Sequence, residues 1–341
     1  MPDKNTRARR LILKALHELG DSAGAAKISE VLDCMGLNLQ PRSVRFHLLQ
    51  MDREGLTRCV ARRKGRQLTE TGERELDKIN VLGKVGYISS RVDELGYRMS
   101  LDILSETGTI IPNVAIISQK DLSRAVHYMT PVFDAKLSIG DYIAYKMHGE
   151  QLGGIMVPRG KIALATICSM TINTLFLKAG IPVHSRFCGL LAMENWAPVG
   201  FVDMIDYNGT SVDPLKLFIL AKLTRVSAYV KSSAGIIGAS FREFPSVAYD
   251  RVLEILNILQ CKHRLNGVIS IGRPNMPLLD IPVGEGRTAM IVIGGLNPIA
   301  ALHEVGVPVE INPLLGLEEI STFNSFSNVA PIGRQSIPYT Y

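Results

Sequence analysis

Little in this sequence suggests secretion or a membrane. Its five cysteines are odd in number and unevenly spaced, so they do not form a disulfide framework, and we expect a reducing cytoplasm. The two most apolar stretches, residues 162–177 and 288–302, are shorter than the ~20 residues that a spanning helix needs, and each contains Gly, Asn, Thr or Pro. The polar, basic start from Met1 to Arg10 does not resemble a signal peptide. The sequence therefore predicts no membrane association.

The motifs of metal and nucleotide chemistry are missing as well. No C-x-x-C or H-x-x-x-H pair is present for structural zinc, and neither a Walker loop nor a complete dinucleotide fingerprint occurs. An enzyme would use Cys188 as nucleophile and His184 as base, but nothing supplies a third group to orient them. Burial in apolar surroundings is the simpler interpretation of Cys168, Cys188 and Cys261. We expect no metal, no cofactor and no catalytic residue, and keep the Cys188–His184 enzyme as the alternative.

Charge is distributed unevenly along the chain. Residues 1–80 carry 16 Lys and Arg against 11 Asp and Glu, a net charge of +5, so the rest contributes only +1 of the total of +6. A basic N-terminal part joined to a nearly neutral body indicates a domain that binds a polyanion, followed by a body with another task. We therefore predict a first domain over residues 1–80 and a second over residues 81–341.

The N-terminal part has the pattern of a winged helix-turn-helix domain. Its apolar spacing predicts three helices, over 6–19, 25–35 and 41–54, each followed by a glycine that stops it. Two short strands follow, over 56–60 and 66–68, and they flank a basic turn. Three helices and a two-stranded ribbon with a basic tip make up the winged-helix plan.

The third predicted helix and the basic turn carry residues that suit DNA. Arginines on the helix fit the paired acceptors of guanine in the major groove, and short hydroxyl side chains hold phosphates. Basic side chains on the turn fit the phosphate backbone or the minor groove. The same charges would also solvate a small domain, but this helical plan favours DNA; His47 suits local packing better. The predicted DNA-binding residues are Arg42, Ser43, Arg45, Phe46, Arg62, Arg63, Lys64 and Arg66.

Residues 40–56 (QPRSVRFHLLQMDREGL) and 65–72 (GRQLTETG) carry a family resemblance. They resemble the winged-helix domain named after ribonuclease R, over nearly all of residues 8–78. That family commonly has a second arginine where this chain has Phe46, which would exchange a guanine or phosphate contact for packing on a thymine methyl group. The resemblance implies DNA binding but no ribonuclease activity, because the rest of the sequence lacks the aspartate cluster that holds the catalytic metal ions of ribonuclease R.

The body mixes short strands and helices. A charged helix over 69–80 leads away from the basic turn, and buried strands then alternate with helices, which indicates α/β or α+β layers. The predicted strands cover 114–118, 142–147, 163–167, 267–271 and 290–293, and the predicted helices cover 120–130, 173–179, 247–259 and 298–305.

The body also contains an internal duplication. The segment 159–183 recurs as 285–309, at a constant offset of 126, with a Gly-aliphatic-Pro-Val run at the same place in both copies. We place two half-repeats at about 83–208 and 209–335. Two copies of one unit usually pack about a pseudo-twofold axis, and the seam between them is a favoured place for a small ligand. Duplication is equally compatible with structural economy.

Four further segments carry a second resemblance: residues 207–219 (YNGTSVDPLKLFI), 158–161, 179–183 and 293–298. They are similar to the regulatory domain of the NrpR family, repressors of nitrogen-assimilation genes best known from methanogenic archaea. The resemblance covers nearly the whole body and implies a dimeric DNA-binding regulator whose affinity for DNA is lowered by 2-oxoglutarate. Some members of the family carry two such regulatory domains, and this chain carries one.

Two strand-to-helix turns at matching places in the halves are candidate effector sites. Residues 168–173 (CSMTIN) and 294–297 (GGLN) would present backbone N–H groups and a helix dipole to the carboxylates of a keto acid. As ordinary tight turns they would simply pack helix on strand. Candidate charge partners are Arg159, Arg186 and Arg287, and the predicted effector-binding residues are Cys168, Ser169, Thr171, Arg186, Gly294, Gly295 and Asn297.

These observations predict a cytoplasmic, homodimeric transcriptional regulator. Its winged helix binds double-stranded DNA, and its duplicated α/β body dimerises, because two DNA half-sites require two heads at a fixed spacing. A small-molecule effector acts by favouring one arrangement of the heads over another. Besides the Cys188–His184 enzyme, an architectural protein that ignores metabolites stays open as an alternative.

Overall fold

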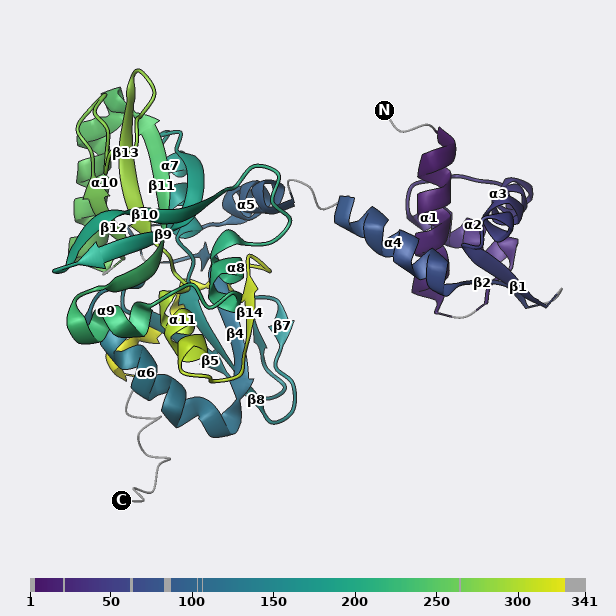
Figure 1. Cartoon of the computed structure of the whole chain (residues 1–341), viewed down its shortest axis with the longest axis horizontal. Coiled ribbons are helices and arrows are strands. Elements are labelled where there is room, and N and C mark those ends of the chain that lie inside the picture. The colour runs from purple at the N-terminus through teal and green to yellow at the C-terminus, as the bar shows by residue number, and fades with distance from the viewer. Residues whose placement is uncertain are drawn as a thin grey trace. The chain divides into compact units, whose positions relative to one another are not determined.

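The computed structural model describes residues 4–20, 22–61, 64–82, 87–102, 104–105, 107–263 and 265–328. The chain divides into two compact units, Met1–Val85 and Gly86–Tyr341 (Figure 1). Helices and sheets are mixed, as the sequence predicts. Within the described ranges, no helix has the length and apolar character needed to cross a membrane.

The first unit is a winged helix-turn-helix domain, which confirms the prediction. The apolar stripes of its helices meet in a core that includes Ile12, Ile28, Leu32, Leu48 and Met51, each at most 1% exposed. The two strands pair antiparallel and form the wing. The elements are α1 (Lys4–Leu19), α2 (Ala25–Cys34), α3 (Pro41–Arg53), β1 (Thr57–Ala61), β2 (Gly65–Leu68) and α4 (Glu70–Leu82).

The second unit follows the two half-repeats along the chain. The first half contains α5 (Tyr87–Arg98), β3 (Thr109–Ile110), β4 (Pro112–Ser118), α6 (Leu122–Asp134), β5 (Tyr142–Lys146), β6 (Gln151–Leu152), β7 (Ile155–Met156), β8 (Lys161–Ile167), α7 (Met170–Lys178), β9 (His184–Glu194) and β10 (Ala197–Asp206). The second half contains α8 (Pro214–Leu220), α9 (Val226–Ser232), β11 (Gly235–Pro245), α10 (Tyr249–His263), β12 (Val268–Ile271), β13 (Arg287–Ile293), α11 (Asn297–Glu304), β14 (Val309–Pro313), β15 (Glu318–Glu319) and β16 (Asn324–Ser325).

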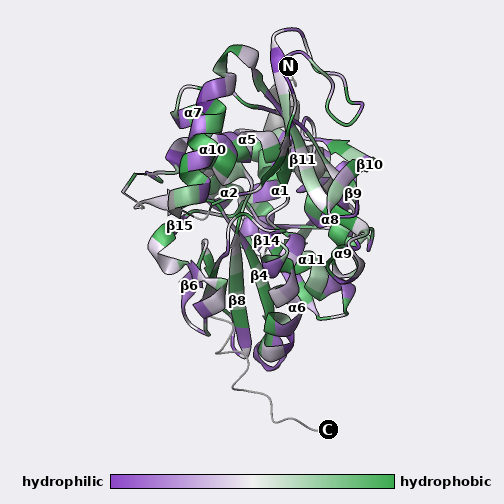
Figure 2. Ribbon diagram, turned by 90° about the vertical axis from the view of Figure 1, so that its left-hand side faces the viewer, coloured by the Kyte–Doolittle hydropathy of each residue, from purple (hydrophilic) through white to green (hydrophobic). Residues whose placement is uncertain are grey.

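Two five-stranded sheets form the centre of this unit. Their strand orders are β10-β9-β11-β13-β12 and β14-β4-β8-β5-β16. Every strand pair in the described residues is antiparallel, so the fold is α+β in type. The interior strands β8 and β13 are buried along six of their seven residues, which explains their continuous apolar sequences. Figure 2 shows β4 and β8 coloured as hydrophobic over most of their length.

The two halves exchange their last strands. Elements β4, α6, β5, β8 and α7 of the first half recur in the same order as β11, α10, β12, β13 and α11 of the second. Strand β9 of the first half then pairs with β11 of the second, and β14 of the second half pairs with β4 of the first. Each sheet therefore contains strands from both halves, and the duplicated sequence folds as one interlocked body.

Candidate functional site

The two turns that the duplication predicts meet where the halves join. At the end of β8, the Thr166 hydroxyl donates a hydrogen bond of 2.7 Å to the Gly295 carbonyl oxygen. A Cβ atom on Gly295 would stand 2.1 Å from the carbonyl oxygen of Ile167, so only glycine permits this approach. On its other side, the Gly294 N–H donates to the Gly238 carbonyl oxygen at 2.8 Å. Gly295 thus makes the close backbone contact between the two halves, while Gly294 contacts the backbone of its own half.

A cavity opens beside this junction. It is small and partly open to solvent. Several wall residues come in pairs at an offset of 126 or 127, so both halves contribute equivalent positions to it. These pairs are Asn113 with Ser240, Cys168 with Gly294, Ser169 with Gly295 and Met170 with Leu296, and the wall is completed by Cys188, Tyr207, Asp213, Leu215 and Ala239.

A fully buried arginine lies directly behind the wall. Arg242 of β11 is 0% exposed, and its Nη1 and Nη2 donate to the carbonyl and the hydroxyl oxygen of Ser169 at 3.0 and 2.8 Å. Its Nε donates to the Ser240 hydroxyl at 3.0 Å. These three acceptors are neutral, and Arg242 takes part in none of the ion pairs formed between described residues.

The position of Arg242 breaks the symmetry of the duplication. The residue at the matching place on β4, 127 residues earlier, is the apolar Ala115. Burial lowers the pKa of the Arg242 guanidinium, yet an arginine stays protonated in proteins. A buried cation without an opposite charge is costly, on the order of several kcal/mol. The wall of the cavity is therefore a place where an anion would relieve an electrostatic penalty.

Burial raises the pKa of each ionisable residue in the wall. Burial raises the pKa of the Cys168 thiol to about 12 and raises the pKa of Cys188 still further from its usual value. Burial also raises the pKa of Tyr207, whose side chain is hydrogen-bonded to Cys188. The pKa of Asp213 is raised by burial too, although its carboxylate accepts the Lys216 N–H at 2.9 Å as the N-cap of α8.

The structure brings together four of the predicted effector-binding residues. Cys168, Ser169, Gly294 and Gly295 all line the cavity. Thr171 and Asn297 do not line it. The fully buried Thr171 hydroxyl bonds to the backbone of Ile111, and the Asn297 amide bonds to both backbone groups of Gly238.

The predicted charge partners lie elsewhere. Arg186 donates to the Glu243 carboxylate at 2.8 Å and to the Pro282 carbonyl oxygen at 2.7 Å, and it stacks over the Phe241 ring. Arg159 is exposed in the turn before β8, and Arg287 is half-buried at the start of β13. None of these three arginines lines the cavity, whereas Arg242, which the sequence did not single out, lies behind its wall.

The geometry does not support the Cys188–His184 enzyme. The two residues lie four positions apart on the extended strand β9, a separation of roughly 13 Å along a strand. His184 is exposed, whereas Cys188 is 4% exposed with a raised pKa, so its reactive thiolate is disfavoured. Across the described residues, no group of three or more His, Cys, Asp or Glu side chains is placed to hold a metal ion.

The winged-helix unit presents part of the predicted DNA-binding set on α3. Arg42, Arg45 and Phe46 are exposed, and Ser43 is half-buried. His47 turns inward and is 6% exposed, and burial together with nearby Arg9 lowers its pKa. A neutral, inward-facing His47 is consistent with a packing role.

The wing holds the remaining predicted DNA-binding residues. Lys64 is exposed at its tip, and Arg62 and Arg63 lie outside the described residues. Arg66 forms an ion pair of 2.6 Å with Asp52 of α3, and its backbone pairs with Ala23. Arg66 thus ties the wing to the helices of its own unit.

Comparison with known proteins identifies both units. The family of "NrpR regulatory domains NRD1 and 2" matches residues 85–325, and the "Ribonuclease R winged-helix domain" matches residues 10–76. A crystal structure of a nitrogen repressor-like protein from Methanococcus jannaschii aligns with a TM-score of 0.58 and 26% identity, over 70% of this chain and 97% of that chain.

Three curated relatives are named as regulators. The chain is 33% identical to the global nitrogen regulator NrpRI of Methanosarcina mazei, over 91% of this chain and 95% of that protein. It is 29% identical to the global nitrogen regulator NrpR of Methanococcus maripaludis and 30% identical to that of Methanocaldococcus jannaschii. In both, it covers 54% of the relative, so it spans about half the length of these two proteins.

Proposed function

Because the chain belongs to the family of NrpR regulatory domains, we propose that it represses nitrogen-assimilation genes and that 2-oxoglutarate lowers its affinity for DNA. Family membership and the winged-helix unit make it a nitrogen-related transcriptional regulator rather than an enzyme. Repression, the effector and a dimeric state are the parts that we add. The proposal that the chain binds an anionic effector rests on the buried Arg242, which has only neutral hydrogen-bond partners and lies behind a cavity at the junction of the halves.

On the DNA side, α3 enters the major groove. Arg42 and Arg45 are exposed there to contact guanine or phosphate, and the exposed Phe46 packs on a thymine methyl group. Lys64, with its neighbours Arg62 and Arg63, holds the phosphate backbone or the minor groove. Two heads at a fixed spacing read two half-sites, which is why we propose a homodimer.

On the effector side, one carboxylate of 2-oxoglutarate binds beside Ser169. The Ser169 hydroxyl accepts a hydrogen bond from Arg242, so its own hydrogen remains available to a ligand in the cavity. The hydrogen bond from the positively charged Arg242 polarises this hydroxyl, which strengthens the hydrogen bond that the hydroxyl donates to the ligand. The Asn113 amide, another wall residue of the first half, is a neutral partner for the keto oxygen.

Fluorescence anisotropy on the full chain tests this proposal. Labelled DNA from the region upstream of its own gene is titrated at fixed salt, with and without millimolar 2-oxoglutarate. We expect 2-oxoglutarate to weaken specific binding at least tenfold. Tight binding that ignores the keto acid would refute the effector, and failure to bind any DNA would refute the regulator.

Two arginine variants locate the effect. Arg242→Met keeps a long unbranched side chain but removes the buried charge, and we expect it to bind DNA without responding to 2-oxoglutarate. Arg159→Met removes an exposed arginine that does not line the cavity, and it should respond as the unmodified chain does. Equal responses of the two variants would place the effector somewhere other than this cavity.

A further inference from the structure

Helix α5 is hydrogen-bonded to a segment that lines the cavity. In its first turn, the Ile88 N–H donates to the Thr210 carbonyl oxygen at 3.3 Å, and the Ser89 hydroxyl donates to the Tyr207 carbonyl oxygen at 3.2 Å. Tyr207 is a wall residue, and two more follow it, Asp213 at the end of the next loop and Leu215 at the start of α8. A displacement of this loop therefore acts directly on the start of α5.

The same helix packs against α7, which begins at the cavity. A Cβ on Gly96 would lie 3.1 Å from the Thr174 hydroxyl oxygen, so the two helices approach closely at this point. Helix α7 starts at the wall residue Met170, directly after Ser169 and Cys168. Leu95 and Met99 of α5 are 0% and 1% exposed, which fixes this face of the helix in the core.

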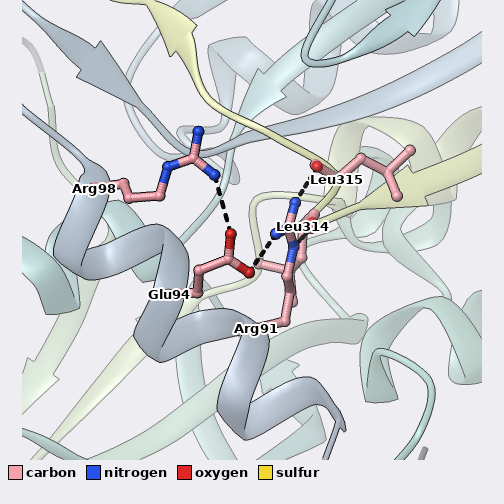
Figure 3. A network of polar contacts seen from close by, with 5 residues as sticks. All are labelled: Arg91, Glu94, Arg98, Leu314 and Leu315. Atoms are coloured by element: carbon pink, nitrogen blue, oxygen red, sulfur yellow. Dashed lines mark hydrogen bonds and ion pairs between the residues drawn. The ribbon is translucent and has the colours of Figure 1, made fainter. Parts of the chain in front are cut away.

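A third contact holds α5 to the segment after β14. Figure 3 shows the Arg91 guanidinium between Glu94 of its own helix and the carbonyl oxygens of Leu314 and Leu315. Its Nε lies 2.9 Å from the Leu314 oxygen and its Nη1 lies 2.6 Å from the Glu94 carboxylate. Arg91 is only 17% exposed at its side chain, whereas Arg98, which bonds the same Glu94 at 3.0 Å, is 60% exposed. Arg91 is the anchored member of the pair.

Helix α5 follows the DNA-binding unit in the sequence, and its contacts connect it to the segments that line the cavity. Helix α4 of the winged-helix unit ends at Leu82 and α5 begins at Tyr87, so four residues of sequence separate them. We propose that α5 transmits occupation of the cavity to the winged-helix unit, and that Arg91 and Ser89 are the positioning residues that couple it. This inference rests on the proposed effector function. A ligand moves the 207–213 loop and the start of α7, and α5, bonded to both, moves with them.

Three variants separate coupling from binding. Arg91→Ala releases α5 from the carbonyl oxygens of Leu314 and Leu315, and Ser89→Ala releases it from Tyr207 on the cavity side. Arg98→Ala is the matched control, because it removes an arginine from the same helix and the same Glu94 without touching another segment. Calorimetry measures 2-oxoglutarate affinity, anisotropy measures its effect on DNA binding, and thermal unfolding checks that each variant is folded.

We expect Arg91→Ala and Ser89→Ala to bind 2-oxoglutarate with an affinity within threefold of that of the unmodified chain. The factor by which 2-oxoglutarate lowers DNA affinity should be at least fivefold smaller in these variants. Arg98→Ala should keep the full effect. Should Arg91→Ala unfold, Ser89→Ala decides alone, because it deletes a single hydroxyl. An undiminished response in both would overturn the coupling role of α5.

Hydrogen exchange decides the inference independently of the effector. Without any ligand, Arg91→Ala and Ser89→Ala should speed amide exchange across residues 207–213 and at the start of α7, and Arg98→Ala should not. If the unmodified chain ignores 2-oxoglutarate, the proposed function fails while this exchange result still tests the link. Unchanged exchange in 207–213 in both variants would show that α5 is not coupled to the cavity.

Discussion

Gly295 of the second half lies against Ile167 of the first, so close that a Cβ on Gly295 would stand 2.1 Å from the Ile167 carbonyl oxygen. No side chain separates the two backbones at this point, and the Thr166–Gly295 hydrogen bond of 2.7 Å closes the contact. Because the cavity wall continues from Gly295 through Gly294, this contact sets the distance between the halves beside the site.

Gly295→Ala should destabilise the body by about 3 kcal/mol, since the added methyl group overpacks a backbone contact that has no flexible side chain to yield. Chemical denaturation followed by the fluorescence of Trp196, the single tryptophan of the chain, measures the change. Gly284→Ala is the control, because its Cβ would meet only the Arg287 side chain at an ordinary 3.5 Å. Equal stability of the two variants would contradict the close junction.

Asp213→Asn should bind 2-oxoglutarate roughly tenfold more tightly near neutral pH, equivalent to about 1.4 kcal/mol. The reason is that a carboxylate in the wall repels an anionic ligand, and an asparagine removes the charge while still capping α8. Burial raises the pKa of Asp213, so affinity in the unmodified chain should rise as the pH falls toward that pKa. Calorimetry across a pH series measures both effects. Weaker binding by the variant would show that the carboxylate contacts the ligand favourably.

The winged-helix unit should lose stability as the solution is acidified, and His47 is the reason. Its pKa is lowered below 6.5 by burial and by Arg9, so the unfolded chain takes up a proton near pH 6.5 while the folded unit does not. The unfolded state therefore binds more protons below this pH, and the free energy of unfolding falls as the pH drops from about 7 to 5.

His47→Leu should flatten this pH dependence. The measurement is amide exchange in α3 at pH 5 and 7.5, corrected for intrinsic exchange rates. Intrinsic fluorescence does not report on this unit, because residues 1–85 contain neither Tyr nor Trp. His17→Leu, which changes an exposed histidine on α1, is the control. A variant that keeps the full acid sensitivity would assign it to another group.

Arg45→Ala should weaken specific DNA binding by about 1–3 kcal/mol, as expected for loss of a base contact, and should relax selectivity at one base pair. Lys64→Ala should instead weaken binding to all sequences alike and reduce the slope of log affinity against log salt by about 1. Arg74→Ala on α4, an exposed arginine paired with Glu70, should leave both quantities unchanged. Anisotropy at several salt concentrations distinguishes the three, and indistinguishable behaviour would contradict the assigned roles of α3 and the wing.

The sequence predicted those parts of the molecule whose signals are local. The helices of the winged-helix unit follow from apolar spacing and glycine stops, and α7 and α11 were found with their strands because both halves repeat one pattern. Helix α5 and strands β9, β10 and β11 were not predicted. Gly189, Gly235 and Gly238 interrupt the strand pattern, and a Cβ on any of the three would clash with a neighbouring segment, which only the fold reveals.

Only part of the cavity could be predicted, because only part of its wall has a local sequence signal. The turns at Cys168 and Gly294 stood out by duplication, but nothing local marks Arg242, an arginine inside an eleven-residue buried strand. Its signal is a comparison of the halves, in which Arg242 takes the place of Ala115. Thr171 and Asn297 were predicted as ligand contacts from their polarity, yet they bond the backbones of Ile111 and Gly238 in the core.

Isothermal titration calorimetry of 2-oxoglutarate into the full chain and into Arg242→Met tests the central claim most directly. The account predicts saturable binding to the unmodified chain, binding by Arg159→Met with the same affinity, and at least tenfold weaker binding by Arg242→Met. Equal affinity in Arg242→Met, or no heat of binding in the unmodified chain at millimolar ligand, would contradict an effector site at the junction of the halves.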